Sequence, residues 1–181
     1  MSRINTVTKE TANLEQQALF DAIQAKLGGV PNFLKILANS PAALRAFLGL
    51  HSIANDGSLD SQTRERIALA VAQQNSCEYC VSAHTAIGHK AGLDSAEIQV
   101  NRSGSSQDAK AAVAVKFARS LVDNMGEVTS AEIIEAREAG YNDAELVEII
   151  THVAMNIFTN IIGKASRVDI DFPKVDLKIA A

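Results

Sequence analysis

Residues 60–90 read DSQTRERIALAVAQQNSCEYCVSAHTAIGHK, and this stretch decides the fold. Its first half, to about residue 74, places apolar side chains at helical spacing and predicts an amphipathic helix. Its second half, residues 76–90, predicts another helix. Only a two-residue turn separates them, so we expect the two helices to fold back antiparallel. The rest of the chain repeats the helical spacing and shows almost no strand alternation, which predicts an all-α fold.

Length and composition place the chain among globular proteins. Its 181 residues are 47% hydrophobic and 21% charged, which predicts one all-helical domain over residues 1–181 with an extended tail from about residue 166. A net charge of -4 without basic runs argues against nucleic acid or an anionic membrane as a partner. No stretch reaches the roughly 18 unbroken apolar residues of a membrane span, and the N-terminus does not resemble a signal peptide. We expect a cytoplasmic protein.

Two segments with the same pattern mark helix boundaries. Residues 91–98 (AGLDSAEI) are echoed by residues 139–146 (AGYNDAEL). In each copy a glycine ends one helix, Asp94 or Asn142 can cap the next, and Glu97 or Glu145 is placed to close a capping box. We interpret the repeated pattern as a signal that ends one helix and starts the next, and a duplicated helical unit remains an alternative.

Chemistry is concentrated in one motif, because Cys77 and Cys80 are the only cysteines. If Ser76 caps the second helix, Cys77 falls in its first turn, where free N–H groups and the helix dipole favour a thiolate. His84 lies one turn beyond Cys80 and can exchange a proton with that sulfur. In the antiparallel pair, Glu65 comes level with His84 or just beyond it, where its carboxylate can orient the imidazole.

Other interpretations of these residues stay open. The four side chains could hold zinc, although no second C-x-x-C or H-x-x-x-H is present. A purely structural disulfide would close too small a loop to constrain the unfolded chain much. Glu65 lies in the charged run of residues 64–66, and such runs are usually solvated. Tyr79 could be a wall of the site, a hydrogen-bond donor or a packed side chain, and neither His51 nor His89 has an evident partner.

Glu65, Cys77, Cys80 and His84 match the pattern E-x11-C-x2-C-x3-H, and in this the chain resembles the alkylhydroperoxidase D branch of the carboxymuconolactone decarboxylase-like family. The turn at residues 29–32 and the helix end at residues 91–93 resemble its peroxidase-related subgroup. The resemblance covers roughly residues 27–93. It implies an alkylhydroperoxidase D-like helical bundle that forms homo-oligomers, with the catalytic C-x-x-C at the N-terminus of a central helix.

The resemblance also implies roles for these residues. Cys80 would be the peroxidatic sulfur, Cys77 the resolving one, and His84 with Glu65 the proton relay, without a cofactor or metal. The partners would be a small hydroperoxide and an external dithiol or thiol-protein reductant. This chain has Tyr79 where the family can carry a histidine, which puts a relay step there in doubt. An analogy with thioredoxin would instead make Cys77 the nucleophile.

We therefore expect an oxidoreductase, a thiol-dependent peroxidase with an antioxidant role. A lactone decarboxylase-type lyase of the same fold and a non-enzymatic redox sensor are the alternatives. Five apolar residues could wall a pocket or, as we expect, fill the core: Phe33, Leu34, Leu37, Phe47 and Leu48. Six more exceed what one amphipathic face needs and indicate an oligomer: Ile149, Ile150, Val153, Ile157, Ile161 and Ile162.

Overall fold

The computed structural model describes residues 2–178, which contain helices and no strand. The helices are α1 (Leu14–Leu27), α2 (Asn32–Leu37), α3 (Pro41–Asn55), α4 (Ser61–Gln74), α5 (Glu78–Lys90), α6 (Ser95–Arg102), α7 (Ala109–Asp123), α8 (Ser130–Glu138) and α9 (Asp143–Ser166). The predicted all-α fold is confirmed. Gly28 closes α1 in the left-handed conformation, and Ser40 caps α3 with Pro41 in its first turn.

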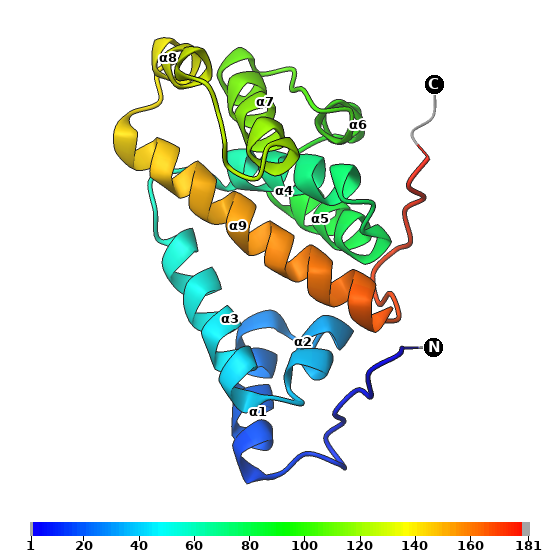
Figure 1. The fold of residues 1–181 in the computed structure, drawn as a ribbon. Coiled ribbons are helices and arrows are strands. Elements are labelled where there is room, and N and C mark those ends of the chain that lie inside the picture. The colour runs from blue at the N-terminus through cyan, green and yellow to red at the C-terminus, as the bar shows by residue number, and fades with distance from the viewer. Residues whose placement is uncertain (1, 179–181) are drawn as a thin grey trace.

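The long helix α9 runs through the middle of the molecule (Figure 1). It packs against α2, α3, α4, α5 and α7, while α4 packs against α5, α6, α7 and α9. Helices α1–α3 lie on one side of α9, and α4–α7 lie on the other. The pair α4 and α5, on which the candidate residues lie, is therefore held in the centre of the bundle.

Two large groups of buried side chains form the core. One joins α1–α3 to the start of α5 and to Val168 in the tail, and it includes Cys77 and Cys80. The other joins α4, α7, α8 and α9. Phe33, Leu34 and Leu37 belong to the first group, and Phe47 and Leu48 pack against it, so these five residues fill the core as expected.

The C-terminal helix is long and apolar enough to cross a membrane, with a mean hydropathy of 1.4 over its most apolar window. Length and composition alone carry that finding, and the core helix of a soluble protein has the same properties. Packing accounts for part of the apolar sequence here, because Ile149 and Val153 are buried in the bundle.

The two echoed segments differ in one respect from the prediction. Asn142 and Glu145 do form a capping box at the start of α9. Asp94 caps α6, but the side chain of Glu97 does not reach back to close a second box. It turns inward and accepts hydrogen bonds from Arg66, Asn101, Ser106 and the backbone of Gln107. The predicted second capping box is wrong, because buried polar partners take this carboxylate instead.

Candidate active site

The turn between α4 and α5 places the cysteines. Asn75 ends α4, and Ser76 adopts a left-handed conformation with φ 52°. The residue that caps α5 is therefore Cys77, and the prediction that Ser76 would do so is wrong. The Sγ atom of Cys77 accepts a hydrogen bond from the backbone N–H of Cys80, with a distance of 3.4 Å. A sulfur that caps a helix lies at the positive end of the helix dipole, which favours its thiolate.

The two sulfur atoms are joined as a disulfide and enclosed by the bundle. The Cα atoms of Cys77 and Cys80 lie 5.2 Å apart. The two residues are only 1% and 3% exposed. Gly163 of α9 lies directly against them, since a Cβ atom there would sit 3.2 Å from the sulfur of Cys77 and 3.7 Å from that of Cys80. Glycine at this position lets the α9 backbone approach the thiol pair closely.

Glu65 and His84 meet as the antiparallel geometry predicted. The Nδ1 atom of His84 lies 2.8 Å from Oε2 of Glu65, and the side chains are 20% and 16% exposed. The charged run around Glu65 is not a solvated face, because Arg64 donates to the carbonyl of Leu59 and Arg66 to Glu97. The imidazole thus has a fixed carboxylate partner and retains some access to solvent.

Tyr79, between the cysteines, is a buried hydrogen-bonding residue. Its hydroxyl donates to Oδ1 of Asp171 at 2.9 Å and accepts from the backbone N–H of Phe33 at 3.3 Å. Burial raises the pKa of Tyr79 far above its usual value, and the negative charge of Asp171 raises it further. The phenol therefore stays protonated at physiological pH.

His51 is a residue of this region whose role the sequence did not reveal. It lies on the exposed side of α3, contacts the ring of Phe47 and pairs with Asn55. Desolvation lowers the pKa of His51, the charge of His84 lowers it further, and Glu65 opposes both effects. His89, by contrast, bonds the carbonyl of Leu93, which satisfies it locally.

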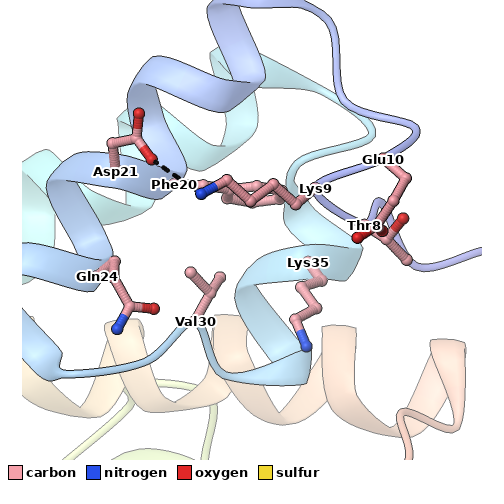
Figure 2. A pocket seen from close by; sticks show the side chains of 8 residues that line it. All are labelled: Thr8, Lys9, Glu10, Phe20, Asp21, Gln24, Val30 and Lys35. Carbon is pink, nitrogen blue, oxygen red and sulfur yellow. Dashed lines mark ion pairs between the residues drawn. The ribbon is translucent and has the colours of Figure 1, made fainter.

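The surroundings do not indicate a metal centre. Among residues 2–178 no group of three or more His, Cys, Asp or Glu side chains is arranged to hold a metal ion. A hollow of about 330 Å³ lies elsewhere, where the N-terminal segment meets α1 and α2 (Figure 2). Its lining contains none of the four candidate residues: Thr8, Lys9, Glu10, Phe20, Asp21, Gln24, Val30 and Lys35.

A helical bundle with paired cysteines at the start of one helix, and an imidazole one turn further on that is bonded to a carboxylate of the neighbouring helix, defines a class of proteins. The sequence profile of the carboxymuconolactone decarboxylase family matches residues 41–120. An uncharacterized peroxidase-related protein from Silicibacter sp. TM1040 superposes with a TM-score of 0.80 and 27% identity, over 93% of this chain and 94% of that one. Over residues 41–120 the chain thus matches the carboxymuconolactone decarboxylase family, and its fold is alkylhydroperoxidase D-like.

Further relatives show the same fold and varied names. The alkylhydroperoxidase AhpD core from Ralstonia eutropha JMP134, an uncharacterized peroxidase-related protein, has a TM-score of 0.84 at 24% identity, over 94% of this chain and 92% of that one. The debrominase Bmp8 has a TM-score of 0.73 at 17% identity, over 93% and 92% of the two chains. An uncharacterized protein from Haemophilus influenzae is 51% identical over 45 residues, which are 24% of this chain and 40% of that protein. The fold is thus shared by proteins with different names, a debrominase among them.

Proposed function

We propose that this protein is a thiol-dependent peroxidase that reduces hydroperoxides through Cys77 and Cys80. One observation carries the proposal: His84, one helical turn after Cys80 on α5, is hydrogen-bonded to Glu65 of α4. Such an arrangement supplies a nucleophile, a second thiol to resolve it and a base that is oriented by a carboxylate.

The reaction begins with the reduced thiols. His84, whose ring is oriented by Glu65, acts as the base that takes the proton of Cys80. The Cys80 thiolate attacks the peroxide O–O bond, and the sulfur becomes a sulfenic acid while the alkoxide takes a proton and leaves as the alcohol. The Cys77 thiolate then attacks the sulfenic sulfur, water leaves, and the disulfide forms. An external dithiol returns both cysteines to thiols and is itself oxidised.

The helix cap bears on the roles of the two cysteines. Because Cys80 N–H donates to the Cys77 sulfur, Cys77 is set up as a thiolate for the resolving step. The same contact would serve Cys77 as first nucleophile in the thioredoxin analogy. We assign the first attack to Cys80, since it lies four residues before His84 on one helix face.

Single cysteine variants test this order of steps. Treated with one equivalent of hydroperoxide, Cys77→Ser should hold a sulfenic acid at Cys80, which dimedone traps and mass spectrometry locates. Cys80→Ser should lose turnover with a dithiol donor, while the wild type should lose two hydrogens at the pair and regain them with dithiol. Full turnover by Cys80→Ser would reverse the assignment. Bound zinc with unreactive thiols would contradict the proposed function altogether.

A lyase acting on a small lactone is the second candidate, and the name of the matched family favours it. Such a reaction has no evident use for a C-x-x-C pair. The double variant Cys77→Ser/Cys80→Ser therefore separates the two functions. Lactone turnover that survives in this variant supports the lyase. Absence of lactone turnover in both the wild type and the double variant supports the peroxidase.

We also propose that the protein forms a homo-oligomer through α9. Of the six apolar residues singled out from the sequence, Ile149 and Val153 are buried in the core. An apolar stripe remains exposed on the other side of the helix, at Val147, Ile150, Phe158 and Ile161. Light scattering after size exclusion should give a mass above 19.3 kDa, and Ile161→Glu should lower it.

A further inference from the structure

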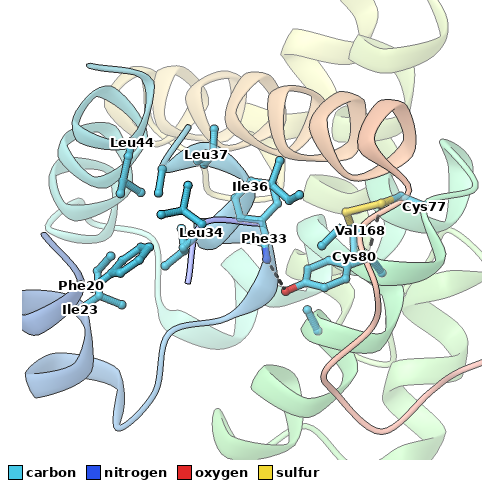
Figure 3. Close-up of a cluster of buried hydrophobic side chains, with 14 of the residues drawn as sticks. Phe20, Ile23, Phe33, Leu34, Ile36, Leu37, Leu44, Cys77, Cys80 and Val168 are labelled. Atoms are coloured by element: carbon cyan, nitrogen blue, oxygen red, sulfur yellow. Dashed lines mark hydrogen bonds between the residues drawn. A yellow bond between two sulfur atoms is a disulfide. The ribbon is translucent and has the colours of Figure 1, made fainter. Parts of the chain in front are cut away.

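The described residues that follow α9 lie against α5, the helix whose start carries the cysteines. We call residues 168–178 the C-terminal strap. Its apolar side chains pack against the same core group as the thiol pair: Val168, Ile170, Phe172, Val175 and Leu177. Figure 3 shows Val168 beside the disulfide. With Gly163 of α9 also in contact with the sulfurs, the strap forms part of the wall that buries them.

Polar contacts attach the strap to one face of α5. Asp171 accepts the hydroxyl of Tyr79, and the backbone N–H of Val175 donates to Oγ of Ser82 at 3.0 Å. Lys174 lies 3.2 Å from Glu78 at the exposed rim. Ser82 lies four residues after Glu78 and three after Tyr79, so it shares a side of the helix with each of them. The strap therefore contacts both residues between the two cysteines, Glu78 and Tyr79.

The contact between Asp171 and Tyr79 differs from the others in strength and position. Tyr79 is 7% exposed, so its hydroxyl would lose a buried partner if the strap moved away. The bond is charge-assisted, since Asp171 supplies a carboxylate, and the second oxygen of Asp171 accepts from the N–H of Asn32 at 2.7 Å. Asp171 thereby ties the strap to α2 and to α5 at once.

We propose that Asp171 is a positioning residue that acts through Tyr79: their hydrogen bond holds the strap closed over Cys77 and Cys80 and determines the size of the thiol reagents that reach them. Small peroxides and small thiols reach the sulfurs past the closed strap, whereas a bulky reagent requires it to open. For the reductant, this inference rests on the proposed peroxidase function. The inference about access to the cysteines does not depend on that function.

Alkylation of the reduced full-length protein tests the proposal. The rates at which iodoacetamide and a maleimide carrying a bulky fluorophore modify Cys77 and Cys80 are measured by mass spectrometry. In Asp171→Ala we expect the rate with the bulky maleimide to rise about tenfold, the factor that 1.4 kcal/mol represents. The rate with iodoacetamide should change less than about twofold. Tyr79→Phe should follow Asp171→Ala, with a smaller effect because the bond to Asn32 remains.

Two further variants separate positioning from general loosening. Asp171→Asn keeps an acceptor oxygen for Tyr79 and should restore most of the size selectivity. Lys174→Ala removes an ion pair of the same strap whose side chains are 67% and 39% exposed, and it should leave both rates unchanged. Unchanged size selectivity in Asp171→Ala and Tyr79→Phe overturns the proposal, as do equal increases with both reagents.

The outcome is independent of peroxide reduction. A protein that fails as a peroxidase can still show the change in alkylation, which would sink the proposed function and leave the strap proposal intact. If the protein is an active peroxidase but its alkylation rates are unchanged in the variants, the proposed function stands and the strap proposal is refuted.

Discussion

Glu65 and Glu97 are both largely buried carboxylates at the sides of α4, with 16% and 6% of their side chains exposed, yet their surroundings differ. Glu65 meets His84, a titratable partner. Glu97 meets Arg66 and three further donors around the loop of residues 103–107. Burial by itself would raise the pKa of Glu97, but its hydrogen bonds, first those from Ser106 and Asn101, lower it to about 2.

The difference distinguishes a structural carboxylate from one that can do chemistry. Glu97 is saturated with donors and stays ionised throughout the physiological range, so it can only hold α4, α6 and the loop together. Glu65 shares its hydrogen bond with the imidazole of His84, a side chain that can act as a general base. Glu65→Gln should therefore affect mainly activity, and Glu97→Gln should affect mainly stability.

The largest expected effect is on turnover. Glu65→Gln keeps the shape of the side chain but removes the charge that orients and supports His84. We expect peroxide turnover with a dithiol donor to fall at least about a hundredfold, within the usual contribution of acid–base catalysis. Glu97→Gln is the matched control and should keep turnover per folded molecule. Equal turnover in Glu65→Gln and the wild type would remove the proposed relay.

Glu97→Gln should reverse this pattern in stability. The change leaves the guanidinium of Arg66, 11% exposed, without its counter-charge. Breaking a buried pair in this way costs about 3 kcal/mol. Urea unfolding at pH 7 measures it, and Glu65→Gln should lower the free energy of unfolding by less than about 1 kcal/mol. Similar losses in both variants would show that the two carboxylates do not differ as described.

The stabilisation that Glu97 provides should depend on pH. The pKa of Glu97 is lowered from 4.5 to about 2 in the folded protein, so its stabilisation is complete above pH 4.5 and is lost as pH falls toward 2. The stability gap between the wild type and Glu97→Gln should narrow by about 2 kcal/mol between pH 5 and pH 3. Urea unfolding at both pH values checks this, and a constant gap would refute the lowered pKa.

The smallest effect is expected at the matching position of the echoed segment. Glu145 occupies the place of Glu97 but closes a capping box with Asn142. Glutamine also serves in that position, so Glu145→Gln should change the free energy of unfolding by less than about 0.5 kcal/mol. Thermal unfolding of Glu145→Gln and Glu97→Gln, measured side by side, compares the two losses of stability. A loss at Glu145 as large as at Glu97 would mean that the buried donors around Glu97 do not set that position apart.

Local rules predicted the parts of the molecule that depend on neighbours in sequence. Helical spacing placed Glu65 opposite His84, because the turn between α4 and α5 leaves little freedom in how they pair. The same rules failed at Ser76 and Glu97. Ser76 takes up the left-handed turn, which moves the cap to Cys77, and Glu97 is drawn to Arg66, 31 residues away in sequence. The sequence also indicated an extended tail, but not that Asp171 would meet Tyr79.

By itself the sequence determined the helices, most of their ends, and the spacing that brings a carboxylate, an imidazole and two thiols to one helix pair, because these follow from 3.6 residues per turn and from local hydrogen bonds. Only the tertiary structure decided that Gly163 and the strap would bury the sulfurs, and which carboxylate would be saturated with donors. Burial and hydrogen-bond partners come from segments far apart along the chain, and no local pattern encodes which of them will meet.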